Sequence, residues 1–134
     1  MPEKILVVDD DPASREVLTF ALRSEGFYVF AAEDGQEGFE KAAAERPDLI
    51  LTDLSMPRCD GVTLINLLRE HSELGDIPIL VLTAYRNEKI EEAMRAGADG
   101  GVAKPLEFDS LLSLIRQVLG SRLKATQAFS QQSL

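Results

Sequence analysis

Short apolar runs recur along this chain with longer helical segments between them, and this alternation constrains the fold more than any other feature. The runs lie at residues 5–8, 49–51, 79–82 and 102–103, and a further strand-like segment lies at 27–32. Because polar residues do not alternate within them, the runs are typical of strands that are covered on both faces. The pattern predicts five strands.

The segments between these strands carry the start and stop signals of helices. Asp11 can cap the first helix, Pro12 suits its first position, and Gly26 ends it. Further helices are expected at residues 36–45, 62–70, 88–96 and 106 to about 123. Strands that alternate with helices at this spacing require right-handed crossovers. We therefore expect an α/β fold of the flavodoxin-like (βα)5 type, a doubly wound, parallel, five-stranded sheet with helices on both faces.

Length and composition suit one domain followed by a short tail. With 134 residues, of which 45% are hydrophobic, the chain can close a core by itself. We assign residues 1–123 to this domain and the polar residues 124–134 to a disordered C-terminal tail. No signal peptide, bilayer-spanning run or second cysteine beside Cys59 is visible, so we expect a cytoplasmic protein in a reducing compartment.

The charge of the chain argues against two classes of partner. There are 14 basic and 23 acidic residues, which gives a net charge of −9. A nucleic-acid backbone or an anionic membrane surface would on average repel such a chain. We therefore expect no direct binding to nucleic acid and no association with a membrane.

Polar residues follow four of the predicted strands at the point where each strand ends. Asp9 and Asp10 follow the first strand, Asp53 the third, Thr83 the fourth and Lys104 the fifth. Taken singly, each has a plain explanation as a capping turn, a β-forming residue or a loop entry. Because the carboxyl ends of parallel strands meet at one edge of a sheet, their joint occurrence predicts a single site.

The chemistry of these groups is that of a metal-assisted phosphoryl transfer. Carboxylates forced together raise one another's pKa unless a positive charge lies among them. Since all the ligands are oxygens, Mg²⁺ is the favoured cation, and Asp9 and Asp10 would hold it. Asp53 is placed to act as the nucleophile, because a carboxylate can form an acyl phosphate. Lys104 and Thr83 would neutralise and hydrogen-bond the phosphoryl oxygens.

The chain resembles the receiver domain of two-component response regulators, the CheY-like family, over about residues 4–119. The stretches that carry the resemblance are 5–12, 48–57 with 60–61, 78–84, and 96–99 with 104–105. The resemblance implies that Asp53 accepts a phosphoryl group from a phosphohistidine. It further implies that Asp10, Asp53 and the main-chain carbonyl of Ser55 ligate Mg²⁺, while Asp9 assists the metal through water.

The resemblance also implies roles for other residues and for partners. Thr83 and Lys104 are expected to contact the phosphoryl group, and the Lys104–Pro105 bond is expected to be cis. The implied donor is a sensor histidine kinase or a histidine phosphotransfer protein, and the implied output is a phosphorylation-dependent surface that binds a downstream protein. The expected state is a monomer or a weak homodimer. Such a module catalyses only its own phosphorylation and dephosphorylation, so we do not expect a conventional enzyme.

One position departs from the family pattern. Family members usually carry an aromatic residue three positions before the lysine, and this chain has Gly101 there. We therefore expect the output change to be carried by the loop after Thr83, which includes Tyr85, and by the helix at 88–96. By resemblance, Ser55 and Tyr85 flank the path of the hydrolytic water, and we expect them to tune the lifetime of the phosphorylated form.

Three other functions are weighed against this one. A phosphatase of the haloacid-dehalogenase type would carry its nucleophile on the first strand in an Asp-x-Asp arrangement and usually a cap, and neither is visible. A flavin- or nucleotide-binding protein is disfavoured because the turn at residues 9–12 is acidic and lacks glycine. A degenerate receiver that acts as a phosphorylation-independent docking module stays open as the alternative because of Gly101.

Overall fold

The computed structural model describes residues 2–56, 59–84, 88–104 and 107–132 of the chain. The chain divides into two compact units, Met1–Lys104 and Pro105–Leu134. Each unit is described by itself below. The predicted cis Lys104–Pro105 bond and the predicted role of Tyr85 fall outside the described residues.

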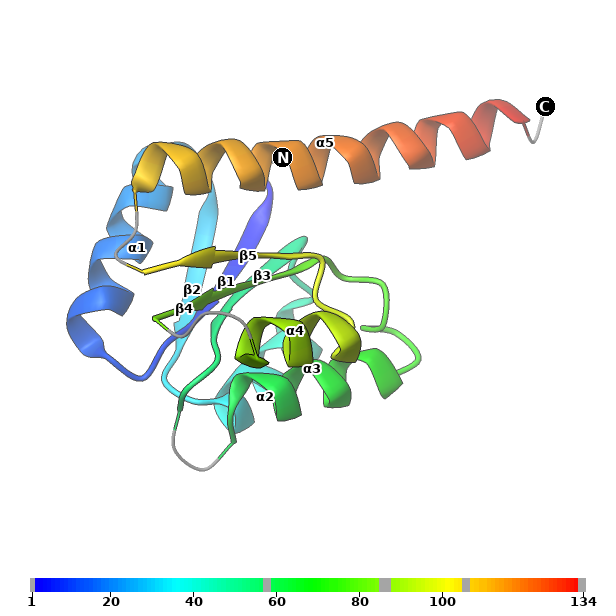
Figure 1. The fold of residues 1–134 in the computed structure, drawn as a ribbon. Coiled ribbons are helices and arrows are strands. Elements are labelled where there is room, and N and C mark those ends of the chain that lie inside the picture. Colours follow the sequence, from blue (N-terminus) through cyan, green and yellow to red (C-terminus); the bar gives the residue numbers. More distant parts are fainter. Residues whose placement is uncertain (1, 57–58, 85–87, 105–106, 133–134) are drawn as a thin grey trace. The chain divides into compact units, whose positions relative to one another are not determined.

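The first unit is a parallel sheet with helices on both faces (Figure 1). The strands are β1 (Lys4–Val8), β2 (Tyr28–Ala32), β3 (Leu49–Asp53), β4 (Ile79–Thr83) and β5 (Gly100–Ala103). All neighbouring strands are parallel, and their order is β2-β1-β3-β4-β5. The predicted flavodoxin-like fold is therefore confirmed, including the strand order that this fold implies.

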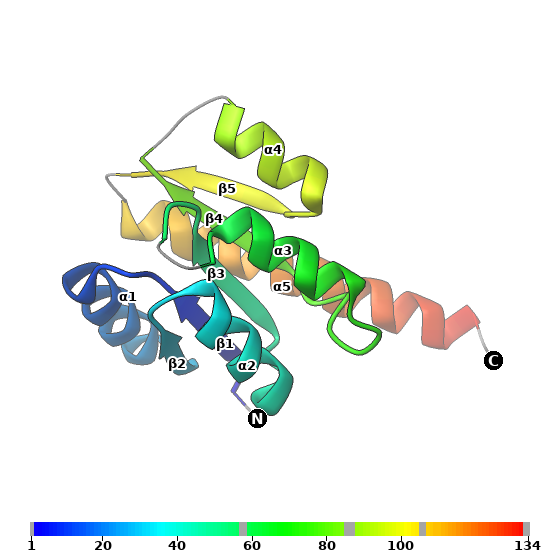
Figure 2. The same ribbon diagram turned by 90° about the horizontal axis from the view of Figure 1, so that it is seen from below.

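Four helices of this unit cover the sheet. They are α1 (Pro12–Ser24), α2 (Gly35–Glu45), α3 (Gly61–Glu70) and α4 (Glu88–Ala96). Figure 1 shows α1 on one face of the sheet, and α2, α3 and α4 on the other. Figure 2 shows these last three helices side by side. The two faces are thus covered as the uninterrupted apolar runs of the strands require.

The main core lies between the sheet and the face that carries α2, α3 and α4. Every residue of β3 and β4 is buried, and so is every residue of β1 after Lys4. From α3, the fully buried Leu64, Ile65 and Leu68 pack into this core. Because these side chains are completely buried, the register of the central strands is fixed. The positions of the residues at their carboxyl ends follow from that register.

Aspartates cap the N-termini of three described helices. Asp11 caps α1 by accepting from the Ser14 N–H, Asp34 caps α2 through the Glu37 N–H, and Asp60 caps α3 through the Thr63 N–H. Each cap satisfies a backbone donor that the helix itself leaves unpaired. The prediction for Asp11 and Pro12 is confirmed, since α1 begins at Pro12.

The second unit contains α5 (Phe108–Gln132). This helix extends past the end expected at about residue 123 into the segment that was expected to be a tail. Neither glycine nor proline occurs after Gly120, so no backbone signal stops the helix there, and a polar composition alone does not prevent helix formation. The domain boundary at residue 123 stays a prediction. Among the described residues, no helix is long and apolar enough to cross a membrane.

Candidate functional site

The strand register brings the predicted site residues to one edge of the sheet. Val8 pairs with Thr52, and Asp53 pairs with Leu82, so Asp9 and Asp53 come from adjacent strands. Thr83, the last residue of β4, pairs with Ala103, and Lys104 follows directly. The predicted convergence of the carboxyl ends of β1, β3, β4 and β5 is therefore present.

Three carboxylates form an acidic cluster at this edge. Oxygens of Asp9, Asp10 and Asp53 all lie within 4.8 Å of one another. Asp9 is 1% exposed and Asp53 is 9% exposed, whereas Asp10 faces solvent. Carboxylates this close repel one another, and burial strengthens the repulsion because water screens it less. A cation in this cluster would relieve that repulsion.

The Lys104 ammonium supplies one positive charge to the cluster. Its Nζ lies 3.2 Å from Oδ2 of Asp53 and 3.3 Å from Oδ2 of Asp9. Burial alone would lower the pKa of Lys104, but the charges of Asp53 and Asp9 outweigh it and the pKa is raised. Lys104 therefore remains an ammonium and bridges the two carboxylates.

Asp9 is the most deeply buried member of the cluster. Burial raises the pKa of its carboxyl, against the opposing effects of the Asp11 N–H, which donates to Oδ1 at 3.0 Å, and of the Lys104 charge. The raised pKa means that the Lys104 ammonium does not fully compensate the cost of burying this charge. The residual cost favours a further cation next to Asp9.

The Asp53 carboxylate is held by one donor on each oxygen. The Ser55 N–H donates to Oδ1 at 3.1 Å, and Lys104 Nζ contacts Oδ2. Two donors fix the plane of the carboxylate while its edge stays partly open to solvent. A fixed and accessible carboxylate can act as a nucleophile.

Thr83 and Ser55, two further residues of the predicted site, lie at the same edge of the sheet. Thr83 is fully buried, and its main-chain carbonyl accepts from the Lys104 N–H at 2.9 Å. Ser55 lies in the loop after β3 and contributes its N–H to Asp53. The phosphoryl contact of the Thr83 hydroxyl and the metal contact of the Ser55 carbonyl stay predictions.

Two residues of the site were missed by the sequence analysis. Arg15 of α1 donates through Nη1 to the main-chain carbonyl of Asp9 at 2.8 Å, which anchors the acidic turn. Gly61 at the start of α3 approaches the end of β3, and its N–H donates to the carbonyl of Leu54 at 3.1 Å. Arg15 could have been predicted, because a basic residue one turn into a helix lies close to the acidic turn that precedes the helix. The close approach of Gly61 to the end of β3 could not be predicted, because it depends on the tertiary structure.

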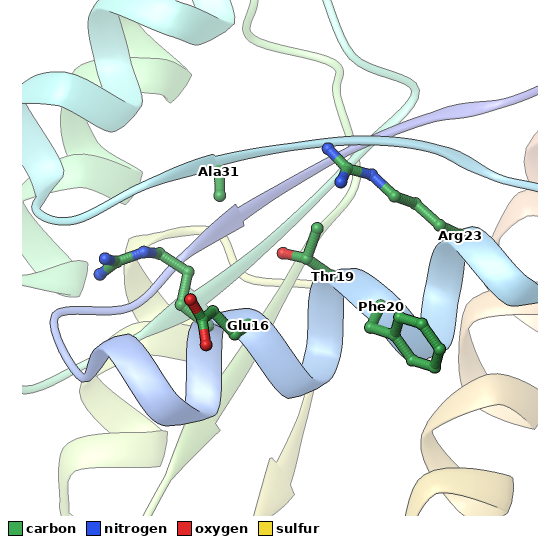
Figure 3. A pocket seen from close by; sticks show the side chains of 6 residues that line it. Glu16, Thr19, Phe20, Arg23 and Ala31 are labelled. Carbon is green, nitrogen blue, oxygen red and sulfur yellow. The ribbon is translucent and has the colours of Figure 1, made fainter.

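A hollow of about 470 Å³ lies beside α1 and β2. Figure 3 shows Thr19 and Arg23 of α1 pointing towards the strand that carries Ala31. The lining residues are Arg15, Glu16, Thr19, Phe20, Arg23 and Ala31. None of the three clustered aspartates lines it, and Arg15 is the lining residue that also contacts the acidic turn.

Comparison with protein families gives a match to the response regulator receiver domain over residues 5–116. A curated relative, the response regulator MprA of Mycolicibacterium vanbaalenii, is 40% identical; the aligned region covers all of this chain and 61% of the relative. The DNA-binding dual master transcriptional regulator RpaA of Synechocystis is 36% identical, with 93% of this chain and 52% of the relative covered. The chain thus spans between half and two thirds of the length of these relatives.

Solved structures of similar chains share the fold. Chemotaxis protein CheY4 of Vibrio cholerae superposes with a TM-score of 0.84 at 34% identity, covering 88% of this chain and 99% of that one. The receiver domain of a sensor histidine kinase from Pseudomonas aeruginosa has a TM-score of 0.84 at 30% identity, covering 90% and 99%. That structure is described as having a magnesium ion coordinated in its active-site cleft.

Proposed function

The chain belongs to the response regulator receiver domain family, and from this premise we propose that it accepts a phosphoryl group on Asp53 from a sensor histidine kinase or a histidine phosphotransfer protein. Receivers are phosphoacceptor signalling modules and not conventional enzymes. The observation that carries the proposal is the Asp53 carboxylate, held between the Lys104 ammonium and the Ser55 N–H beside two further carboxylates.

In the proposed reaction a carboxylate oxygen of Asp53 attacks phosphorus while the bond from phosphorus to the imidazole nitrogen breaks. The electron pair of that bond leaves with the imidazole, and an acyl phosphate forms on Asp53. Lys104 already contacts Asp53, so its ammonium is within reach of a phosphoryl oxygen on that carboxylate. The Thr83 hydroxyl would donate a hydrogen bond to another phosphoryl oxygen.

The acidic cluster fits a hard divalent cation. Among the described residues its three carboxylates supply oxygen ligands, and the Lys104 ammonium pairs with two of them, Asp9 and Asp53. Asp10, Asp53 and the Ser55 carbonyl would hold Mg²⁺ directly, and Asp9 would contact it through water. When bound, Mg²⁺ supplies positive charge that offsets the negative charge of the phosphoryl oxygens. The magnesium described in the Pseudomonas receiver domain supports this assignment.

The output of the module is a phosphorylation-dependent surface that binds a downstream protein. We propose that the chain works in the cytoplasm, as a monomer or weak homodimer, without binding nucleic acid or membrane itself. The DNA binding in the name of RpaA belongs to a protein of which this chain covers 52%, so it is not transferred here. The net charge of −9 supports this separation.

A degenerate receiver that docks partners without phosphorylation is the second candidate, and Gly101 favours it. A Cβ added at Gly101 would lie 2.9 Å from Cγ2 of Val81, so a side chain at this position would require the Val81 side chain to shift. Because glycine has no ring, an aromatic switch of the usual kind is missing at this position. The acidic cluster, Asp53 and Lys104 are nevertheless assembled, which favours the phosphoacceptor.

Phosphorylation of the full chain distinguishes the two candidates. The protein is incubated with Mg²⁺ and acetyl phosphate, and its intact mass is recorded, with a chelator in a parallel sample. We expect a single Mg²⁺-dependent phosphoryl adduct on the native chain and on Asp76→Asn, a matched control at an exposed loop aspartate, and none on Asp53→Asn. Absence of the adduct from the native chain with Mg²⁺ bound would refute the phosphoacceptor and favour the docking module.

A further inference from the structure

Strand β5 delivers Lys104 to the site, yet its own side chains do little to hold it in register. None of its four residues is buried, whereas every residue of β3 and β4 is buried. Two of the four, Gly100 and Gly101, have no side chain to pack. Register is weakly specified in glycine-rich strands without a buried face. The packing of its own side chains therefore does not fix the position of β5 along β4.

The contacts of Lys104 require that register. A slip of one residue moves a strand by about 3.3 Å and turns each side chain to the opposite face. The Lys104 Nζ lies 3.2 Å from Asp53 and 3.3 Å from Asp9, so a shift of that size would remove it from both carboxylates. The position of the ammonium therefore depends on where β5 begins.

Asp99, directly before β5, is bonded twice to the first residue of β4. The Ile79 N–H donates to Oδ2 of Asp99 at 2.8 Å, and the Asp99 N–H donates to the Ile79 carbonyl at 2.8 Å. This pair of bonds sets the starting level of β5 against β4. It lies at the end of the strands opposite to the acidic cluster.

Arg69, near the end of α3, holds Asp99 and the turn before it. Its Nη2 donates to Oδ2 of Asp99 at 3.0 Å and to the Gly97 carbonyl at 2.7 Å, and its Nε donates to the same carbonyl at 3.0 Å. Its Nη1 donates to the carbonyls of Gly75 at 2.9 Å and Ile77 at 2.7 Å, just before β4. All five N–H groups of the guanidinium are thus used, which a lysine could not reproduce.

The backbone is shaped to receive this arginine. Gly97 has a φ of +122°, and a Cβ there would lie 2.9 Å from Cγ and Nε of Arg69. The side chain of Arg69 therefore packs directly on the turn between α4 and β5. The segments before β4 and before β5 are tied to the same guanidinium.

We infer that Arg69 and Asp99 form a clamp that fixes the start of β5 and thereby positions Lys104, at the other end of the strand, beside Asp53. Neither residue touches the acidic cluster, so both are positioning residues. The inference concerns the placement of a side chain in the unphosphorylated protein, and its consequence for phosphoryl transfer rests on the proposed function.

Chemical labelling of lysines in the metal-free full chain tests the clamp. The Lys104 side chain is 22% exposed, against 42% for Lys4 and Lys41, which serve as internal references. In Arg69→Gln we expect acetylation of Lys104, read by peptide mass spectrometry, to rise several-fold relative to Lys4 and Lys41. Arg46→Gln, which removes a surface ion pair with Glu73, is the matched control and should leave the ratio unchanged.

A merely stabilising role predicts a different pattern. Loss of global stability labels all three lysines equally in the unfolded fraction, so it raises the ratio only as far as that fraction, measured by urea denaturation, allows; the clamp predicts a rise beyond this amount. Asp99→Asn is the milder second variant: its amide oxygen can still accept from the Ile79 N–H, but its charge on Arg69 is gone. It should raise the same ratio by a smaller factor.

The functional arm is the rate of phosphorylation by acetyl phosphate. In Arg69→Gln, displacement of Lys104 should slow phosphorylation about tenfold or more. In Arg46→Gln, the phosphorylation rate should be unchanged. An unchanged labelling ratio in both Arg69→Gln and Asp99→Asn overturns the clamp whatever the rates show. If the native chain accepts no phosphoryl group, the proposed function fails, and the labelling ratio still decides the clamp.

Discussion

Gly61 is the position where a single methyl group should disturb the acceptor most directly. A Cβ at this residue would lie 2.8 Å from the Cα of Leu54 and closer still to the carbonyl oxygen of Asp53. Ordinary contacts of a Cβ begin at 3.4 Å, so the shortfall at the Leu54 Cα is 0.6 Å (3.4 minus 2.8) and larger at the Asp53 carbonyl. Both obstacles are backbone and cannot rotate away.

Gly61→Ala must therefore move the start of α3 or the end of β3. Overpacking of this kind costs about 1–3 kcal/mol of stability. A misplacement of about 1 Å in a reacting group can cost about a hundredfold in rate, so a shift somewhat above half that size should slow phosphorylation about tenfold or more. The decrease in the phosphorylation rate should be larger than the decrease in the fraction of folded protein.

Two measurements check this prediction: urea denaturation, and the initial rate of the Mg²⁺-dependent adduct by intact mass. Gly120→Ala is the matched control, because a Cβ at Gly120 in α5 has no neighbour within 4 Å. It should keep the native rate and be at least as stable, since alanine favours helices. A Gly61→Ala protein with native stability and rate would refute the argument from backbone contact.

Three further predictions concern charge and output. Lys104→Gln should slow phosphorylation and tighten Mg²⁺ binding, because the ammonium competes with the cation for Asp53 and Asp9; calorimetric titration measures the affinity, and weaker binding would contradict the assignment. Asp9→Asn should stabilise the metal-free fold at neutral pH, since a carboxyl whose folded pKa is raised costs stability while it is ionised. The gain in the free energy of unfolding, measured by urea denaturation, should shrink as the pH falls through that raised pKa. A gain that grows as the pH falls would contradict this explanation. Amide hydrogen exchange in residues 84–96 should change on phosphorylation if the loop after Thr83 and α4 carry the output; identical exchange in both states would rule that out.

Local pattern was sufficient for much of the fold and for placing the candidate site residues at one edge of the sheet. An uninterrupted apolar run indicates a strand with two covered faces, and Asp11 with Pro12 marks a helix start, because both signals act between residues close in sequence. Since parallel strands all end at one edge, Asp9, Asp53, Thr83 and Lys104 could be assigned to one site without any coordinates. The extension of α5 past residue 123 was missed because a polar composition was interpreted as a tail, although no glycine or proline ends the helix there.

The geometry of the site was decided by the tertiary structure. The strand order puts β1 beside β3, which brings the Asp9 and Asp53 carboxylates under one ammonium. The five hydrogen bonds of Arg69 go to four acceptor atoms on four residues up to 30 positions away in sequence, and no periodic pattern links these residues. Short-range periodicity by itself determined the elements and the edge at which their polar ends meet. Differences of a few tenths of an ångström between side-chain atoms depend on how all the crossovers pack together. Only the tertiary structure therefore decided which charged groups are in contact.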